Sequence, residues 1–247
     1  MCFSLSAQKI IDLSGKWSFS IDRQDNGEKE KWFSHTLNDF INLPGSMPEK
    51  LKGDEVTAKT QWTGSLYDSS YYYNPYMEKY RKEGNIKFPF FLTPDKHYVG
   101  AAWYQKEVNI PADWKGERIL LFLERPHIET TVWVNGQKTG MQNSLCVPHQ
   151  YDITRYVRPG KCTITIRVDN RIKEINVGPD SHSITDQTQG NWNGIVGRIC
   201  LQTTPKTYFD DIQIYPEPEQ KLARVKVVIK GAGINKNKII SGEFQYG

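Results

Sequence analysis

The 247-residue chain is long enough to bury one large domain, or one such domain together with part of a second. Its 32 basic and 28 acidic residues leave a net charge of +4, and because the two signs are interspersed we expect no nucleic-acid partner. No apolar stretch approaches the roughly 20 residues that a membrane-spanning helix needs, so no membrane span is expected.

Residues 1–8 are mostly small and apolar, and the segment 4–7 (Ser-Leu-Ser-Ala) resembles the end of a cleaved secretory signal. The basic and apolar regions of a complete signal are missing, so a frayed terminus explains this stretch equally well. If the signal interpretation holds, the protein is exported, and we expect a periplasmic or secreted location.

Cysteine usage argues against both a disulfide framework and a zinc site. Once Cys2 is set aside, Cys146, Cys162 and Cys200 remain, an odd number without C-x-x-C spacing. Cys162 and Cys200 lie in strand-like apolar patterns, where a free cysteine usually packs as a small hydrophobe. We expect no metal site and no cofactor.

Short alternating apolar segments recur along the chain and predict β-strands. In chain order they fall at 17–21, 108–110, 119–123, 128–134, 162–168, 199–201, 212–214 and 225–229. The segment 119–123 is apolar at both parities, which is typical of a strand covered on both faces. No stretch keeps a helical period over three turns. Short strands without crossover helices indicate an all-β fold, an antiparallel sandwich of jelly-roll type.

Two segments interrupt this pattern. Residues 62–98 are long for a loop and rich in tyrosine and phenylalanine, a composition that argues against disorder. They could form an aromatic platform at a substrate cleft, or pack back against the protein. Residues 215–218 (Tyr-Pro-Glu-Pro) indicate a linker, after which only two strand-like segments follow.

Two strands cannot bury a core by themselves. We therefore divide the chain into a sandwich domain over 9–216, with an insertion at 62–98, and an incomplete immunoglobulin-like sandwich over 217–247. The chain is expected to be a fragment of a longer protein.

Four motifs occur in a fixed order: Trp-Tyr at 103–104, Val-Trp-Val-Asn-Gly at 132–136, Asp-Ile-Thr at 152–154, and Asn-Trp-Asn-Gly-Ile at 191–195, followed by Arg198. The Asn-Gly pair alone predicts a tight hairpin. The ordered set resembles the N-terminal sugar-binding domain of glycoside hydrolase family 2, the β-galactosidase and β-glucuronidase family, over about 13–216. The resemblance implies a jelly roll followed by an immunoglobulin-like domain and a (β/α)8 barrel that carries two catalytic glutamates.

Retaining glycoside hydrolysis needs two carboxyl groups about 5–5.5 Å apart. The resemblance places the acid/base in an Asn-Glu dipeptide, which this chain lacks. Glu124, Glu129, Asp210 and Asp211 are interpreted as ordinary surface or turn residues. We expect no catalytic residue in this chain, and no hydrolysis by the chain alone.

The resemblance also implies that a loop before residue 191 brings an acidic side chain to the terminal sugar. Thr188 occupies the matching position, and Asp186, two residues earlier, is the candidate for the same role. A carboxylate suits the task because it can accept two hydrogen bonds from neighbouring hydroxyls. The alternative is that Asp186 and Thr188 cap a turn.

Three further residues complete the predicted substrate-binding set. Trp192 could stack on a sugar ring or belong to the core. His182 could hydrogen-bond a hydroxyl, and Asn191 opens the last motif. Asn193 and Arg198 are expected to fix the strand junction rather than to meet a ligand.

Two functions follow for a carbohydrate-binding sandwich. The first is an accessory domain of an exo-acting β-glycosidase, which supports the barrel and lends one loop to the sugar site. The second is an autonomous carbohydrate-binding module. The strand-like segments after residue 217 favour the first. A protein-interaction sandwich without any glycan role is a third possibility.

Overall fold

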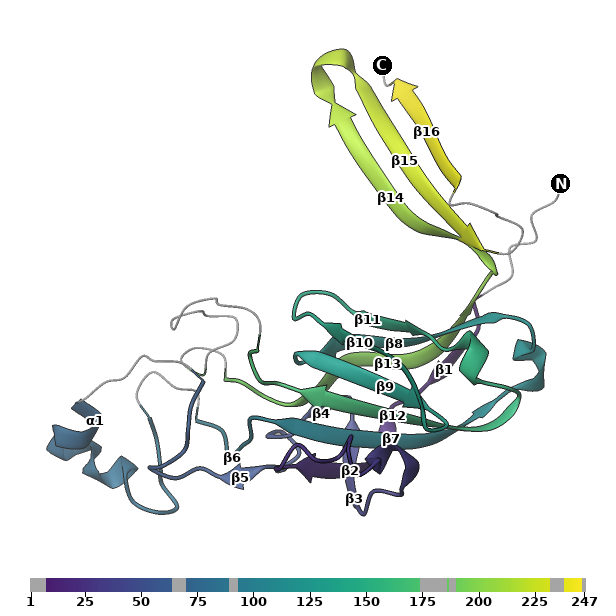
Figure 1. Ribbon diagram of the computed structural model, residues 1–247. Helices are drawn as coiled ribbons and strands as arrows, with labels where there is room; N and C mark the ends of the chain where they lie inside the picture. Colours follow the sequence, from purple (N-terminus) through teal and green to yellow (C-terminus); the bar gives the residue numbers. More distant parts are fainter. Residues whose placement is uncertain are drawn as a thin grey trace.

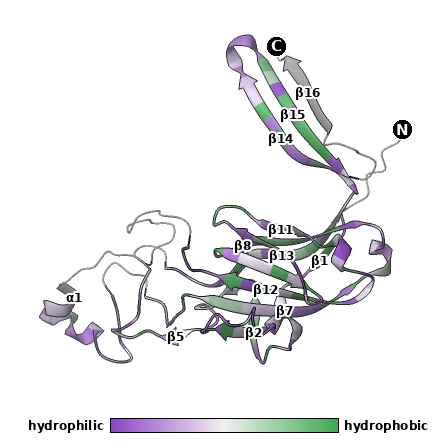
Figure 2. Ribbon diagram, in the orientation of Figure 1, coloured by the Kyte–Doolittle hydropathy of each residue, from purple (hydrophilic) through white to green (hydrophobic). Residues whose placement is uncertain are grey.

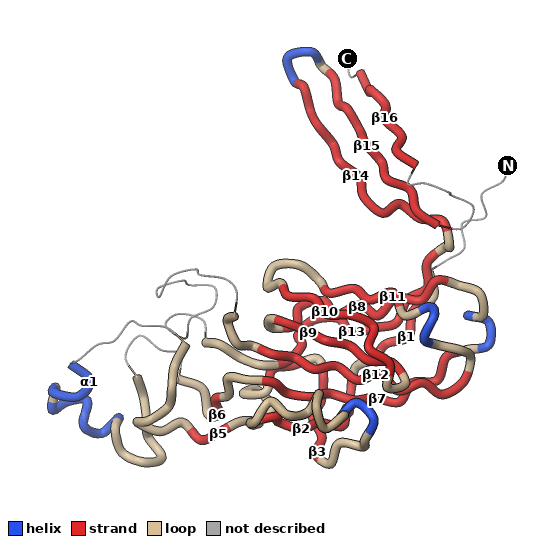
Figure 3. The backbone as a smooth tube through the Cα atoms, in the orientation of Figure 1, coloured by secondary structure: helices blue, strands red, loops and turns tan. Residues whose placement is uncertain are grey.

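The computed structural model describes residues 8–63, 70–88, 93–173, 186, 190–231 and 238–245. Most regular structure in these residues is β-strand, and helix is confined to segments of three to six residues (Figure 3). Two antiparallel sheets form a sandwich, and a separate three-stranded sheet projects from it (Figure 1). The all-β jelly-roll prediction is confirmed. Residues 1–7 of the signal hypothesis lie outside the described part.

The first sheet of the sandwich has five strands. Its order is β1 (Ile10–Asp12), β13 (Gly194–Thr204), β8 (Arg118–Pro126) and β11 (His149–Asp152), with β4 (Gly45–Ser46) paired to β13.

The second sheet has six strands. Its order is β10 (Gln137–Asn143), β9 (Glu129–Val134), β12 (Gly160–Asp169), β7 (Ala101–Ile110), β2 (Gly15–Asp22) and β3 (Asp39–Leu43). A two-stranded ribbon of β5 (Asp54–Glu55) and β6 (Lys96–His97) lies beside the sandwich. Within the described residues, no helix is both long and apolar enough to cross a membrane.

The core lies between the two sheets and follows from the period of two in the strands (Figure 2). Inward positions are fully buried and include Trp17, Phe19, Leu121, Leu123, Val132, Ile164 and Ile166. Leu120 and Phe122, on the opposite face of β8, are buried as well. The prediction that 119–123 is covered on both faces is therefore confirmed. Cys162 and Cys200 are buried and unpaired, as expected for cysteines that pack as small hydrophobes.

A second apolar cluster covers the outer face of the six-stranded sheet. Trp103 and Trp133 lie 4.9 Å apart between ring centroids, and Phe33 stacks on Trp133 at 5.2 Å. The indole Nε1 of Trp103 donates to Asp22 Oδ2 at 2.9 Å. A Cβ atom on Gly27 would lie only 2.5 Å from that nitrogen. The turn after β2 therefore requires glycine at this position.

The Asn-Gly hairpin forms as predicted. Asn135 and Gly136 both have positive φ, 49° and 77°, and they connect β9 directly to β10. Asn135 Oδ1 also accepts a hydrogen bond from the backbone N–H of Thr163 at 2.9 Å. The side chain thus ties the turn to the neighbouring strand β12.

The linker predicted at 215–218 is wrong. Strand β14 (Thr207–Glu217) continues through it and pairs with β15 (Leu222–Gly231), which pairs in turn with β16 (Lys238–Gln245). A 3-10 turn at Pro218–Gln220 joins β14 to β15. Pro216 lies on β14, an edge strand of the described sheet, which is where proline is tolerated because alternate N–H groups there face away from the neighbouring strand. The change from sandwich to third sheet falls instead at residues 205–206.

One face of the third sheet is apolar and open to solvent. Phe209, Ile212 and Ile214 of β14 are 66%, 53% and 63% exposed. Their register partners on β15 are Ile229, Val227 and Val225, so six apolar residues share one face. Exposed apolar patches of this kind promote association.

We expect the double variant Ile212→Lys/Ile214→Lys to reduce self-association of the chain, because it places two charges on the apolar face. The matched control is Gln213→Lys on the same strand, whose side chain points to the other face. Light scattering across a concentration series measures the effect. Equal behaviour of the two variants would show that this face does not drive association.

Candidate functional site

The candidate site is the end of the sandwich where four strands begin or end together. Strands β7 and β9 begin here at Ala101 and Glu129, and both pair with Asp169 at the end of β12. Strand β13 begins nearby at Gly194, which pairs with Ser46. The described residues that flank the two segments singled out by the sequence, 62–63 and 98 for the insertion and 173 and 190 for the loop before residue 191, lie at this end of the chain's sandwich.

Asn193 binds the strand ends together from a fully buried position. Its Nδ2 donates to the carbonyl oxygens of Gly100 and Val168, both at 2.9 Å. Its Oδ1 accepts from the hydroxyl of Tyr104 at 2.7 Å. Backbone groups buried at strand ends must find partners, and one amide supplies them here. The expectation that Asn193 fixes the strand junction is confirmed.

The glycine that follows Asn193 is required by close packing. A Cβ atom on Gly194 would lie 2.5 Å from the carbonyl oxygen of Gly45, and its φ is +141°. Only glycine therefore lets β13 pair with the short strand β4.

Asn191 and Asn170 extend this network outward. Asn170 Nδ2 donates to Asn191 Oδ1 at 3.0 Å and to the Tyr98 carbonyl at 2.9 Å. Asn191 Nδ2 donates to the Asn170 carbonyl and to Thr63 Oγ1, at 3.0 and 3.1 Å. Asn191, a predicted substrate contact, is thus buried and bonded to protein groups. Its side chain joins the sandwich to the first residues of the insertion.

Asp186 is 1% exposed and forms a clasp with the same segment. Its carboxylate accepts from the backbone N–H of Thr63 at 2.5 Å and from the backbone N–H of Asn191. Its own N–H donates to the Thr63 carbonyl at 2.8 Å. Burial raises the pKa of this carboxyl above its usual range, against the opposing effect of the two N–H donors. We call this arrangement of Thr63, Asp186 and Asn191 the Thr63 clasp.

The hydrogen bonds of the clasp match the alternative in which Asp186 caps a turn of the backbone. The predicted contact between Asp186 and a sugar stays a prediction. His182 and Thr188 lie outside the described residues.

Trp192 is half-buried and stacks on His127, with ring centroids 4.5 Å apart and planes at 20°. His127 Nδ1 lies 2.6 Å from the Trp192 carbonyl oxygen, so this nitrogen is the donor. Burial lowers the pKa of His127, which favours the neutral ring. Sequence reasoning missed His127, because a single histidine between two strands carries no pattern.

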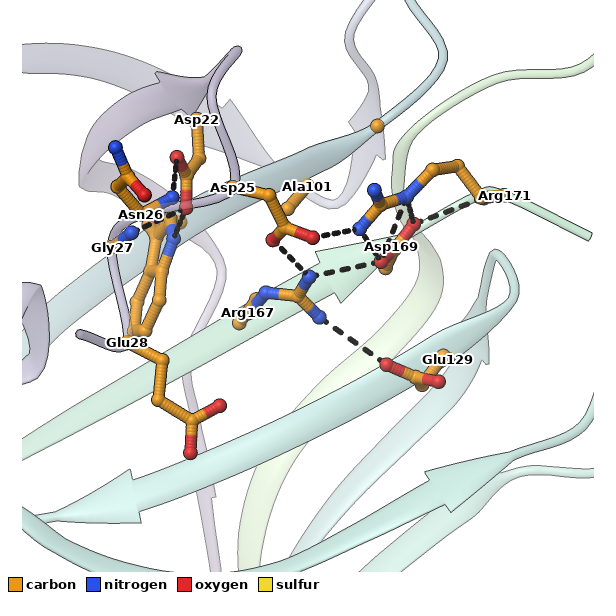
Figure 4. Close-up of polar contacts among 12 residues, drawn as sticks. Asp22, Asp25, Asn26, Gly27, Glu28, Ala101, Glu129, Arg167, Asp169 and Arg171 are labelled. Carbon is orange, nitrogen blue, oxygen red and sulfur yellow. Dashed lines mark hydrogen bonds and ion pairs between the residues drawn. The ribbon is translucent and has the colours of Figure 1, made fainter. Parts of the chain in front are cut away.

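An ion cluster lies beside this network (Figure 4). Arg167 Nη2 binds Asp25 Oδ1 at 2.6 Å and Asp169 Oδ2 at 2.9 Å, and its Nη1 binds Glu129 Oε1 at 3.2 Å. Arg171 contacts both Asp169 and Asp25. The interpretation of Glu129 as an ordinary surface residue is therefore wrong, since its side chain is only 12% exposed.

The cluster fixes the segment that leads toward the predicted sugar loop. Lys173 donates to Asp169 Oδ2 at 2.8 Å and to Glu129 Oε1 at 3.0 Å. Burial opposes ionisation of Asp169, but hydrogen bonds from Arg171 and Lys173 outweigh it and hold the pKa of that carboxyl well below its usual range. The Asp169 carboxylate therefore stays charged and does not serve as a proton donor at neutral pH.

The insertion has an anchored side and an exposed side. Tyr71 in α1 (Ser70–Tyr73) is 2% exposed, stacks on Phe88 at 4.9 Å, and donates its hydroxyl to the Tyr80 carbonyl at 2.9 Å. Tyr73 and Tyr76 are 82% and 85% exposed. Packing thus accounts for Tyr71, whereas the other two remain available for contacts.

The polar and charged side chains described at this site bind other groups of the protein and so fix the position of the backbone segments around them. In the part of the chain that is described, no three histidine, cysteine or acidic side chains are grouped to hold a metal ion. The acidic groups of the ion cluster are neutralised by arginine and lysine, and Asp186 is enclosed by backbone donors. The geometry holds two loops at one end of a rigid sandwich.

Comparison with protein families gives a match to "Glycosyl hydrolases family 2, sugar binding domain" over residues 10–205. Human β-glucuronidase is 24% identical over 263 residues, covering 94% of this chain and 35% of that protein. β-Glucuronidase from Paenibacillus borealis is 27% identical over 222 residues, covering 84% of this chain and 31% of that protein. The chain thus spans about a third of the curated relatives it matches.

Solved structures agree on the fold. A β-glucuronidase from an uncultured Clostridium species superposes with a TM-score of 0.59 at 20% identity, over 100% of this chain and 40% of its own. The Ruminococcus gnavus β-glucuronidase also gives 0.59, at 17% identity, over 97% of this chain and 38% of its own.

We expect Asp169→Asn to destabilise the chain by about 3–5 kcal/mol, because it takes the buried counter-charge from Arg167, which is itself buried. The control is Glu107→Gln, which removes an exposed ion pair with Lys161 and should change little. Urea denaturation at neutral pH measures both.

The folding stability of the wild-type chain and of Asp169→Asn should also depend differently on pH. The folded-state pKa of Asp169 is depressed, so its stabilisation is present above the unfolded value of 3.8 and is lost as the pH falls through and below it. The wild-type chain should therefore lose more stability than Asp169→Asn between neutral pH and pH 3. Parallel pH profiles would contradict this role for Asp169.

Proposed function

The chain belongs to glycoside hydrolase family 2, and from this membership we propose that it is the N-terminal part of a longer β-glucuronidase-type hydrolase. The observation that carries the proposal is the family match over residues 10–205. The names of the relatives favour a β-linked glucuronide over a galactoside as substrate. Carbohydrate metabolism is the corresponding physiological role.

The catalytic pair belongs, in this proposal, to a (β/α)8 barrel outside this chain. Hydrolysis with retention needs one carboxylate as nucleophile and a second carboxyl group as acid/base. The buried carboxylates Asp169 and Glu129 are instead held by cations, so they suit a structural role. The 247-residue chain is expected to be inactive by itself.

The contribution of this chain is to position loops at the sugar. The Thr63 clasp fixes the segment around Asp186 and the base of the insertion in one place. From there Asp186, Thr188, His182, Asn191 and Trp192 are proposed to meet or orient the substrate. Preorganised loops increase affinity because less freedom is lost on binding.

The apolar face of the third sheet supports a further partner domain. An antiparallel sheet with one apolar face is stable when a second sheet covers that face at about 10 Å. We assign the cover to the remaining strands of an immunoglobulin-like sandwich in the same polypeptide. Export to the periplasm or cell exterior is also part of the proposal, and the resemblance of residues 4–7 to the end of a secretory signal supports it.

The proposal is tested with the complete protein encoded by the gene, assayed on p-nitrophenyl β-D-glucuronide and on the matching β-D-galactoside. The complete protein should hydrolyse the glucuronide preferentially, and the purified 247-residue chain should hydrolyse neither. Preference for the galactoside would refute the proposed sugar. Turnover by the chain alone would refute the assignment of the catalytic pair to a barrel outside this chain. Tight binding of free sugar by an inactive complete protein would favour a carbohydrate-binding module.

In the complete protein, we expect Asp186→Ala to lower kcat/KM by about 10- to 100-fold, the effect of losing a hydrogen bond to a charged group. The matched variant Thr63→Ala loosens the clasp through Asn191 but keeps the carboxylate. Circular dichroism checks that both variants fold. If Asp186 only organises the loop, the two variants will lower kcat/KM equally, and its sugar contact is then excluded.

A further inference from the structure

A pocket of about 460 Å³ opens beside the β5–β6 ribbon, and none of the three clasp residues lines it. Its volume lies within the roughly 300–1,000 Å³ of small-molecule sites. The residues that line it include Arg23, Asp54, Lys59, Thr60, Gln61 and His97. The lining is mixed, since Tyr98 and Val99 add apolar surface beside these polar side chains, and a sugar likewise offers both hydroxyl groups and apolar C–H surface.

The wall of this pocket is preformed by pairing and burial. Asp54 on β5 pairs with His97 on β6, and His97 is only 6% exposed. His97 Nε2 lies 3.2 Å from the Gln61 carbonyl oxygen. Its Nδ1 is buried without a hydrogen-bond partner among the described residues. The ribbon and the segment 57–61 are therefore held against each other before any ligand binds.

The hydroxyl groups in the pocket retain donor capacity. Thr60 Oγ1 accepts from the Thr57 N–H at 2.9 Å, and Thr57 Oγ1 accepts from the Lys59 N–H at 3.1 Å. Each oxygen accepts from the backbone, so each O–H proton is left to donate to a ligand. Gln61 Nε2 donates to the Lys59 carbonyl at 3.3 Å, which orients its side chain. Donors arranged in this way suit the oxygens of a sugar.

Two basic and two acidic side chains line the pocket, Arg23 and Lys59 with Asp54 and Glu55, and Glu55 is paired with Lys96, which lies outside the lining. Asp54 is neutralised by Arg23. Lys59 is exposed and has no acidic partner among the ion pairs of the described residues. A single lysine ammonium next to hydroxyl donors suits a ligand with one anionic group.

The pocket is also close to the clasp. Gln61 lies two residues before Thr63, so the backbone separates their Cα atoms by at most about 7 Å. Thr63 in turn is bonded to Asp186 and Asn191. A glycan chain that reaches the proposed sugar end can therefore extend toward this pocket.

We propose that the pocket is a second sugar subsite, which holds an anionic sugar residue of an extended glycan. Lys59 binds the anionic group, a carboxylate or a sulfate, and Thr57, Thr60 and Gln61 bind ring oxygens and hydroxyls. The relation to a cleavage site rests on the proposed function, whereas binding to this chain does not.

The test is NMR titration of the ¹⁵N-labelled 247-residue chain with D-glucuronic acid, glucose 6-sulfate and glucose at constant ionic strength. Both acidic sugars should shift the backbone amides of residues 57–61, and the tighter of the two identifies the preferred anionic group. Lys59→Ala should weaken their binding about 5- to 10-fold, the loss expected for one charge-assisted contact. The matched control is Lys161→Ala, an exposed lysine near the opposite end of β12.

Absence of shifts at residues 57–61 with all three sugars would overturn the subsite. Equal binding of glucose, or unchanged affinity in Lys59→Ala, would overturn its anionic character. Because the readout is binding by the chain alone, these failures are distinct from loss of glucuronide hydrolysis in the complete protein. Hydrolysis with no binding here refutes the subsite only, and binding here without hydrolysis refutes the proposed function only.

Discussion

The need to satisfy buried backbone groups at one end of the sandwich is the constraint on which the rest of this structure depends. Where β7, β12 and β13 meet, carbonyl oxygens leave the ladders in an environment that excludes water. Asn193 and Asn170 provide the missing donors and acceptors with their amides. A buried polar group without a partner costs about 1–3 kcal/mol, so these amides decide whether the strand ends can converge.

The ion cluster acts on the same region by a different means. Replacing a buried ion pair by apolar residues is often neutral, so its value here is positional rather than a large gain in free energy. Arg167 joins the turn at Asp25 to β9 and β12, and Arg171 continues the contact beyond the strand. The described residues 171–173 after β12 are therefore held against the sandwich. A rigid scaffold with loops at one end is a common arrangement for binding sites.

Three parts of the chain have different structural roles. The sandwich core supplies stability through apolar burial, the polar end holds the described segments around Thr63, Asp186 and Asn191 together, and the third sheet carries an exposed apolar face. The pocket beside the β5–β6 ribbon belongs to the second of these parts, since its wall runs directly into the Thr63 clasp. A sugar-binding role fits this arrangement, because the polar side chains that could meet a sugar lie on the segments outside the core and on the β5–β6 ribbon. The core itself is apolar.

Local physics made much of the fold predictable from sequence. Alternation with a period of two located six of the eleven described sandwich strands, and the Asn-Gly pair at 135–136 fixed a hairpin, because each depends only on neighbouring residues. The same kind of reasoning failed at Pro216, where a residue that usually interrupts strands lies on an edge that tolerates it. The order of the motifs was enough to predict the family.

The site needed the tertiary structure. Asp186 and Thr63 are 123 residues apart, and Arg167 and Asp25 are 142 apart. Sequence alone determined that Asp186 is an acid near the start of a strand. Only the folded chain decided that this acid is buried against the base of the insertion. The reason is that hydrogen-bond partners at such separations are chosen by how the sheets pack, and no local pattern records that choice.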